Sequence, residues 1–285
     1  MHETETTETT ETSPSEQAAL WKGVGGEHWV MMQQVLDDLF RPIEETLTEA
    51  VVASGARRVL DVGCGTGAIT LALAAALGEG ATCTGIDISD PMIDAARRRA
   101  EQAGLPATFV LADAQRHEFE PGTVDAVVSR FGVMFFDDEV AAFANLRRAA
   151  VDGAVLRTAV WRSPRENPFM TTAERAAAPL VPLPERVPGA PGQFAHADPD
   201  HVRRVLHESG WRDVELVAID PVCTMPLAEL ERYLVELGPI GRALAGADDE
   251  LREQVIAQVR PAFDPYVDGE QVRFAAACWL VCATA

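Results

Sequence analysis

The sequence lacks any stretch of about 18 uninterrupted apolar residues, the shortest run typical of a membrane-spanning helix. Its first residues, MHETETTETTETSPSEQ, also lack the basic start and the apolar run of a secretory signal peptide. Both absences argue against a membrane or secreted protein. We therefore expect cytoplasmic residence.

Basic residues are scarce as well, with 24 Lys and Arg against 44 Asp and Glu and a formal net charge of −20. Binding of DNA or RNA needs clustered Lys and Arg to neutralise phosphates, so the composition argues against a nucleic-acid partner. The cysteines are scattered and number five, which argues against a disulfide framework and for reduced, mostly buried thiols.

The chain divides by its local patterns into three parts. Residues 1–14 are almost all Thr and Glu, cannot bury apolar area, and are expected to form a disordered acidic tail. Residues 15–55 show two or three helical patterns separated by the turn KGVGG, and we expect a helical lid there. Residues 56–285 alternate strands and helices, which predicts an α/β domain with a parallel sheet.

The strands expected in this α/β domain are short apolar runs: 58–62, 82–88, 108–112, 126–130, 154–161, the run VELVAI and the last run, VRFAAACWLVC. Asp137 is expected to cap the helix before the fifth strand, and Gly153 to end it. Residues 162–199 hold eight of the 18 prolines around one helical pattern. This composition predicts a cap insertion outside the sheet, a common place for substrate contacts.

A glycine-rich turn, VLDVGCGTG, follows the first strand of the domain. Gly63, Gly65 and Gly67 permit close backbone approach at a helix N-terminus, and Asp61 ends the strand beside them. A nicotinamide-binding fingerprint reads G-x-G-x-x-G, whereas this one reads D-x-G-x-G-x-G. The spacing therefore disfavours a dinucleotide, and a tight turn without a ligand stays an alternative.

The next two strands also end in acids. Asp87, in GIDIS, is placed to accept hydrogen bonds from a ribose diol, and Asp113, in LADAQ, is placed to accept one from an adenine amino group. An ordinary helix cap is the alternative for Asp113.

These motifs and the run DAVVSRFGVMFF, in this order and spacing, resemble those of the class I S-adenosylmethionine-dependent methyltransferases, particularly the group similar to quinone-biosynthesis methyltransferases. The resemblance covers residues 58–161. It implies S-adenosyl-L-methionine as cofactor and a Rossmann-like, mostly parallel sheet of seven strands with an antiparallel last strand. The family's usual Pro-Gly-Gly before strand five is AVDGAV here, outside the expected cofactor crevice.

The resemblance also implies roles for individual residues. The methionine moiety is assigned to Asp61, Gly63, Gly65 and Gly67; the ribose to Asp87 and Ile88; the adenine to Asp113 and Ala114; and the neighbourhood of the methyl group to Ser129, Arg130 and Phe131. Met92 is expected beside the same cofactor. Trp21 and Trp29 flank the predicted glycine turn and are expected to pack on the adenosyl group, where aromatic faces favour a sulfonium. Core anchors of the lid are the alternative for both tryptophans.

Methyl transfer is an in-line displacement, so alignment and desolvation can supply much of the catalysis and a general base is optional. The candidates for such a base are His28, His196 and Tyr233. His201 and Asp198 are weaker candidates. A substrate pocket is expected from Met134, Phe135, Trp161, Phe169, Met170 and Phe194, with plain core packing as the alternative. The run Asp137, Asp138, Glu139 is interpreted as a helix start rather than a metal site.

These residues predict methylation of an oxygen, nitrogen or carbon nucleophile of a small molecule, in specialised or quinone-like metabolism. The alternative is N-methylation of the terminal amine of a short natural-product peptide. A cofactor-binding protein without catalysis and a nicotinamide dehydrogenase are weaker hypotheses. A monomer or a homodimer is expected, with no nucleic-acid or membrane partner.

Overall fold

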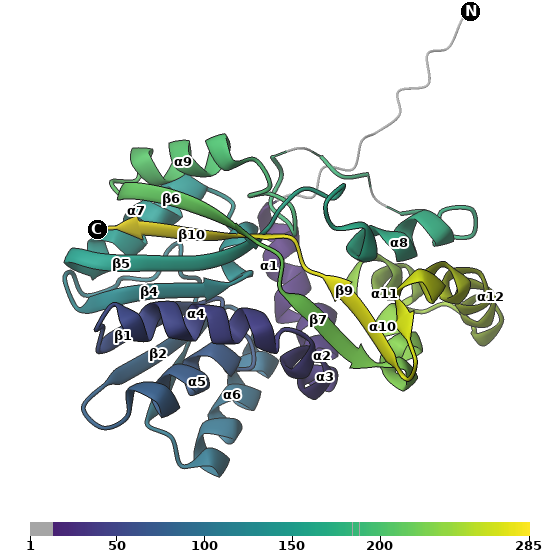
Figure 1. Ribbon diagram of the computed structural model, residues 1–285, viewed down its shortest axis with the longest axis horizontal. Coiled ribbons are helices and arrows are strands. Elements are labelled where there is room, and N and C mark those ends of the chain that lie inside the picture. The colour runs from purple at the N-terminus through teal and green to yellow at the C-terminus, as the bar shows by residue number, and fades with distance from the viewer. Residues whose placement is uncertain (1–13, 184, 188) are drawn as a thin grey trace, which may run out of the picture.

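The computed structural model describes residues 14–183, 185–187 and 189–285, so nearly all of the Thr- and Glu-rich tail lies outside the described residues. A seven-stranded sheet in the order β3-β2-β1-β4-β5-β10-β6 forms the centre of the molecule (Figure 1). β10 runs antiparallel to both of its neighbours, and the pairs among β1 to β5 are parallel. The predicted fold class is confirmed. The strands span Arg58–Val62 (β1), Thr82–Asp87 (β2), Ala107–Leu111 (β3), Val124–Arg130 (β4), Ala150–Trp161 (β5), Arg212–Ile219 (β6) and Cys278–Thr284 (β10).

Helices connect and cover the strands of the sheet. α4 packs beside α5, and α7 packs beside α9. Their bounds are Arg41–Ala53 (α4), Ala68–Leu77 (α5), Asp90–Ala103 (α6), Glu139–Ala149 (α7) and Pro199–Glu208 (α9). Among the described residues, no helix is long and apolar enough to cross a membrane.

The segment expected as a lid over 15–55 has two different roles. Ile43, Leu47 and Val51 recur every four residues on α4 and are fully buried, because α4 packs on β4 and β5. α3 (Gln33–Leu39) likewise buries Leu36 and Leu39. α1 (Pro14–Lys22) contributes to the wall of the cavity described below, and α2 (Val24–Met31) packs against α6.

The predicted glycine turn between α1 and α2 is shorter than expected, because α2 already begins at Val24. Gly26 lies inside α2, where a Cβ would come within 2.3 Å of Ser89 Oγ and 2.5 Å of Trp21 O. The glycine is therefore needed for close packing of α2 against the start of α6 rather than for a turn.

The helix before β5 also differs from the expectation. Asp138, not Asp137, caps α7 by accepting a hydrogen bond from Ala141 N at 2.9 Å. The helix ends at Ala149, and Gly153 lies inside β5.

The expected last strand, 272–282, is in fact two strands in two sheets. β9 (Gln271–Ala275) pairs with β7 (Val222–Pro226) and β8 (Val267–Asp268) in a small second sheet, and β10 returns to the main one. The break falls where Asn167 Oδ1 accepts a hydrogen bond from Ala277 N at 2.9 Å and its Nδ2 donates to Ala277 O at 2.9 Å. An apolar run hides such a break, because Ala276, Ala277 and Cys278 around it are all buried.

The small sheet lies beyond the end of the main sheet where β10 begins, together with a group of helices (Figure 1). The Pro-rich segment contributes one of them, α8, which packs against α11 and α12. Their bounds are Pro168–Ala177 (α8), Leu230–Glu236 (α10), Gly238–Leu244 (α11) and Asp249–Val259 (α12). The insertion is thus part of a larger unit that sequence inspection did not predict.

Candidate active site

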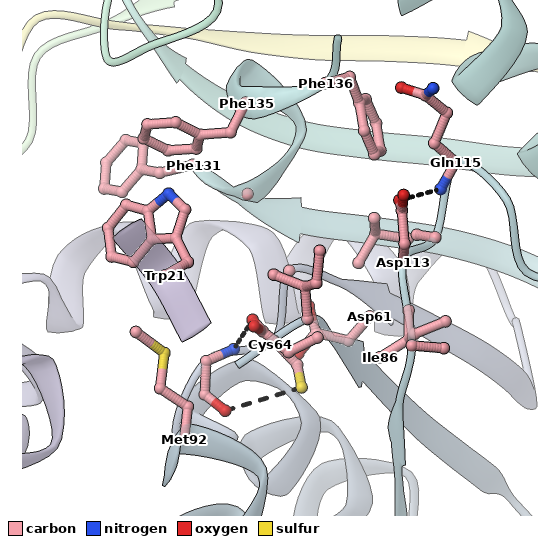
Figure 2. A pocket seen from close by; sticks show the side chains of 18 of the residues that line it. Trp21, Asp61, Cys64, Ile86, Met92, Asp113, Gln115, Phe131, Phe135 and Phe136 are labelled. Carbon is pink, nitrogen blue, oxygen red and sulfur yellow. Dashed lines mark hydrogen bonds between the residues drawn. The ribbon is translucent and has the colours of Figure 1, made fainter. Parts of the chain in front are cut away.

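A cavity of about 450 Å³ lies at the carboxyl ends of β1, β2 and β4. Figure 2 shows Trp21 and Met92 on one side of it, Asp113 and Phe136 on the other, and Asp61 and Cys64 between them. Most of the residues expected around a cofactor line this cavity: Trp21, Trp29, Asp61, Gly63, Gly65, Asp87, Ile88, Met92, Asp113, Ala114, Arg130 and Phe131. The carboxyl ends of adjacent parallel strands meet at one edge of a sheet, which explains why acids far apart in sequence share one cavity.

Two expected cofactor residues lie behind the wall of the cavity. Gly67 is the N-cap of α5 and faces Phe109. Ser129 donates a hydrogen bond from Oγ to Val62 O at 2.7 Å and accepts one from Gly132 N at 3.1 Å. Ser129 therefore ties the end of β1 to the turn after β4.

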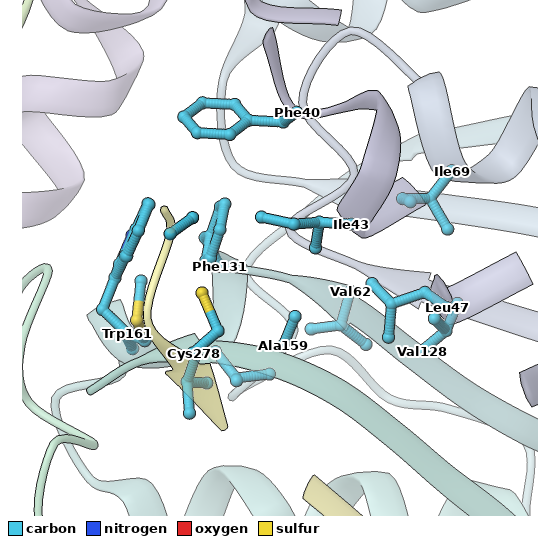
Figure 3. Close-up of a cluster of buried hydrophobic side chains, with 14 of the residues drawn as sticks. Phe40, Ile43, Leu47, Val62, Ile69, Val128, Phe131, Ala159, Trp161 and Cys278 are labelled. Atoms are coloured by element: carbon cyan, nitrogen blue, oxygen red, sulfur yellow. The ribbon is translucent and has the colours of Figure 1, made fainter. Parts of the chain in front are cut away.

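The floor of the cavity is a contact between two backbones. Gly63 has a φ of 64°, and a Cβ on it would lie 2.6 Å from Gly132 Cα. Phe131, just before Gly132, has a φ of 68°, which is rare for a bulky residue. Its ring stacks on Trp161 at 4.6 Å between centroids, beside Phe40 (Figure 3).

Asp61 is almost fully buried, with 1% of its surface exposed. Thr70 Oγ1 donates to Asp61 Oδ2 at 2.6 Å, whereas Oδ1 is buried and has no hydrogen-bond partner among the described residues. Burial raises the pKa of Asp61 to about 7, opposed by the Thr70 hydrogen bond and the charge of Arg130. A buried carboxylate with one free oxygen favours a ligand that carries a positive charge and a donor.

Asp87 lies at the end of β2. Its Oδ2 accepts from Gly65 N at 2.8 Å and its Oδ1 from Ser89 N at 2.9 Å, so it fixes the glycine turn as well as the wall of the cavity. Burial raises the pKa of Asp87, and these backbone hydrogen bonds oppose the shift. A carboxylate has about four acceptor positions, so room remains for a diol.

Asp113 lies opposite Trp21 and next to Phe136 (Figure 2). Its Oδ1 accepts a hydrogen bond from Gln115 N at 2.9 Å, and Arg116 Nη1 donates one to its Oδ2 at 2.6 Å.

The three consecutive acids at 137–139 lie near Asp113. Burial raises the pKa of Asp137, which also lines the cavity. Asp138 caps α7, and Glu139 accepts from two histidines, so the three consecutive acids serve separate purposes.

Aromatic side chains cover the cavity. The ring of Trp21 lies edge-on to Phe135 at 5.1 Å and to Trp29 at 5.9 Å between centroids. Trp21 Nε1 is buried without a partner in the described part of the chain. Both tryptophans therefore anchor α1 and α2 and at the same time line the cavity.

Of the six residues expected to form a substrate pocket, only Phe135 lines this cavity. Met134 is buried below it, Trp161 stacks behind Phe131, and Phe169 stacks on Phe274 at 3.8 Å in the smaller unit. In that unit Met170 Sδ accepts a hydrogen bond from the Tyr233 hydroxyl. The guanidinium of Arg186 lies over the ring of Phe194. The apolar character of residues in a Pro-rich segment predicts that they are buried. It does not predict in which part of the fold they are buried.

The three candidate bases also lie outside the cavity wall. His28 Nδ1 is 2.6 Å from Glu236 O, and His196 Nε2 is 3.0 Å from Glu139 Oε1. Burial raises the pKa of Tyr233, whose hydroxyl donates to Met170 Sδ at 3.7 Å. The weaker candidates are engaged too, since His201 contacts Glu139 and Asp198 caps α9.

Gly26→Ala is expected to loosen the cover of the cavity, because the added methyl group would clash with Ser89 Oγ and Trp21 O. We expect faster cleavage by trypsin after Lys22 and a roughly tenfold loss of affinity for a ligand in the cavity, in line with the few kcal/mol that overpacking costs. Gly23→Ala is the control, since its Cβ would meet only Ala19 O, at 3.2 Å. Equal behaviour of the two variants would show that α2 does not hold the cover.

Comparisons with known proteins point in one direction. A family model described as a methyltransferase domain matches residues 59–153. The nocamycin O-methyltransferase of Saccharothrix syringae is 35% identical over 112 residues, or 39% of this chain and 40% of that protein. The demethylmenaquinone methyltransferase of Roseiflexus castenholzii is 30% identical over 166 residues, or 55% of this chain and 68% of that protein.

The similarity extends to solved structures. The magnesium protoporphyrin IX methyltransferase of Synechocystis PCC 6803 with bound SAH has a TM-score of 0.56 at 17% identity, covering 95% of this chain and 99% of that one. At 17% identity this similarity shows a shared fold and nothing more. The chain spans 40 to 51% of the length of three curated relatives that it matches.

Proposed function

The chain belongs to the class I S-adenosylmethionine-dependent methyltransferases, and from this membership we propose that it transfers a methyl group from S-adenosyl-L-methionine to an oxygen, nitrogen or carbon nucleophile of a small molecule. The observation that carries the proposal is the meeting of Asp61, Asp87 and Asp113 in one cavity under an aromatic cover. The curated relatives named above act, by their names, on a specialised metabolite and on a quinone precursor. An acceptor of that general kind is therefore our first choice.

The residues of the cavity fit this cofactor. Asp61 Oδ1 is a buried acceptor without a partner, which suits the ammonium of the methionine half. Asp87 keeps acceptor capacity for the ribose diol, and Asp113 for the adenine amino group. When bound, S-adenosylmethionine supplies an electrophilic methyl group on a positively charged sulfur.

The chain's own residues contribute position and exclusion of water. Gly63 and Gly132 bring the ends of β1 and β4 into backbone contact. Trp21, Trp29 and Phe135 form an apolar, aromatic cover, which favours a cation and lowers the local dielectric. Because His28, His196 and Tyr233 lie elsewhere, we propose that alignment and desolvation carry the reaction and that the acceptor needs no histidine or tyrosine base.

A screen with methyl-labelled S-adenosylmethionine tests the proposal. Small phenols, amines, keto acids and short peptides are incubated with the protein, and methylated products are detected by mass spectrometry. Asp87→Ala is the control, because a site built on this carboxylate loses transfer with it. Label on small molecules supports the proposal, whereas label on peptides alone would replace it with N-methylation of a peptide amine.

Binding of S-adenosylhomocysteine is expected to strengthen as the pH rises. The pKa of Asp61 is about 7 in the free protein, so this carboxyl is mostly protonated at pH 6 and mostly ionised at pH 7.5. Only the ionised form attracts an ammonium, which predicts an affinity about eightfold higher at pH 7.5 than at pH 6.

5′-Methylthioadenosine is the matched ligand for this measurement, because it has the ribose and adenine but no ammonium. Its affinity should change less over the same range, since any titration of Asp87 affects both ligands alike. Calorimetric titrations at four pH values provide the comparison. Parallel pH profiles for the two ligands would show that Asp61 does not bind the ammonium.

A further inference from the structure

Arg130, the last residue of β4, has a buried guanidinium. Only 9% of its side chain is exposed, it lines the cavity, and its Nη1 has no hydrogen-bond partner among the described residues. Burial lowers the pKa of Arg130, and the charges of Asp37, Glu44 and Asp61 oppose the shift. A buried guanidinium with an unused N–H group is costly unless a ligand accepts from it.

The contacts that Arg130 makes position its guanidinium but leave some of its N–H donors unused. Its Nη2 is 4.0 Å from Asp37 Oδ1, at the outer limit of an ion pair, and its guanidinium lies 5.8 Å from the centroid of the Phe40 ring. Asp37 is engaged more closely by Arg99, whose Nη2 donates to Asp37 Oδ2 at 2.6 Å. Arg130 therefore keeps donors for a further anion.

Asp37 also connects Arg130 to the glycine turn. The other terminal nitrogen of Arg99 donates to Thr66 O at 2.6 Å, within the turn. Asp37 itself lies on α3 and outside the cavity wall. One carboxylate thus faces two arginines, one that holds the turn and one that lines the cavity.

The free groups of Asp61 and Arg130 are complementary. Asp61 Oδ1 is an acceptor and Arg130 Nη1 is a donor, both are buried, and neither finds a partner in the described chain although their residues line one cavity. An α-amino acid group carries an ammonium and a carboxylate on one carbon, and it would satisfy both. An apolar ligand end would leave both unpaired.

We propose that Arg130 binds the α-carboxylate of the methionine half of the cofactor and that Asp37 is a positioning residue that orients Arg130 for this contact. The proposal rests on the function proposed above. It concerns only the carboxylate, since Asp61 accounts for the ammonium.

Decarboxylated S-adenosylmethionine tests the proposal, because it lacks only the carboxylate. Calorimetry of the full chain should show that S-adenosylmethionine binds the unmodified protein about 10- to 100-fold more tightly than its decarboxylated form, the usual range for a charged hydrogen bond. In Arg130→Met this preference should disappear. In Asp37→Asn it should fall by about three- to tenfold, because the guanidinium remains but is less well oriented.

Two further variants separate binding of the carboxylate by Arg130 from a general effect of positive charge in the cavity. Arg130→Lys keeps the charge and should retain part of the preference. Arg116→Met removes a cation that lines the cavity beside Asp113, and it should change the affinity of both ligands by the same factor. Retained binding of the decarboxylated ligand by Arg130→Met shows that the variant is folded. Some loss common to both ligands is expected, because the charge of Arg130 lowers the pKa of Asp61.

One result would overturn the inference: a preference for the carboxylate that survives in Arg130→Met, whether or not both ligands lose affinity by the same factor. If the unmodified protein binds neither ligand, the proposed function itself fails. That outcome is distinct, because it appears before any variant is compared.

Discussion

Gly63→Ala is expected to destabilise the fold and abolish binding of S-adenosylhomocysteine. The added Cβ would lie 2.6 Å from Gly132 Cα and 3.3 Å from Gly132 C, and both are backbone atoms. Ser129 ties these two segments together, so they cannot separate without losing its hydrogen bonds. Overpacking and a left-handed alanine together should cost roughly 3 kcal/mol or more.

Gly122→Ala provides a closely matched control for this variant. Gly122 has the same φ, 64°, but a Cβ there would meet nothing within 4 Å. The free energy of unfolding of this control should fall only by the cost of an alanine in the left-handed region, about 1 to 2 kcal/mol. The control should bind S-adenosylhomocysteine like the unmodified protein. Denaturant unfolding and calorimetry measure both effects. Equal stability and equal binding of the two variants would show that the contact between Gly63 and Gly132 is unimportant.

Asp61→Asn is expected to change binding and stability in opposite directions. The folded-state pKa of Asp61, about 7, is above its ordinary value of 3.8. A raised carboxyl pKa stabilises the folded state fully below pH 3.8, and this contribution is lost as the pH rises to about 7. At pH 8 the buried charge therefore costs up to about 4 kcal/mol relative to a neutral group.

Asparagine is neutral and retains an oxygen that can accept from Thr70. We expect Asp61→Asn to raise the free energy of unfolding by about 2 kcal/mol or more at pH 8, to raise it by less than half as much at pH 5, and to weaken S-adenosylhomocysteine binding by about 100-fold. Asp152→Asn, at a carboxylate with 93% exposure, is the control and should change neither. A loss of stability at pH 8, or unaltered binding, would contradict this account of Asp61.

The predictable part of the site follows from the geometry of parallel strands. Asp61, Asp87 and Asp113 each lie at or just after the carboxyl end of a strand of the βαβ succession, and the ends of such strands meet at one sheet edge. Their placement around one cavity therefore needed only the strand pattern. Trp21 and Trp29 were expected there from the family resemblance, in which an N-terminal helical segment closes over the cofactor, and both line the cavity.

The unpredicted part depends on contacts between distant segments. Phe169 and Met170 joined the smaller unit because β7, β8 and β9 form a sheet from short segments that alternate too briefly to be recognised. Asp37 looked like any acid on a helix surface. Its position between Arg99 and Arg130 depends on how α3 docks, and no local pattern encodes that docking.

The central claim is that the cavity holds the adenosyl cofactor of a methyltransferase. Calorimetric titration of the full chain with S-adenosylhomocysteine, and in parallel with NAD, tests it most directly. We predict one S-adenosylhomocysteine per chain with a Kd below about 100 μM, in the usual range for enzyme ligands, and no binding of NAD. Tighter binding of NAD, or no binding of S-adenosylhomocysteine, would contradict the claim.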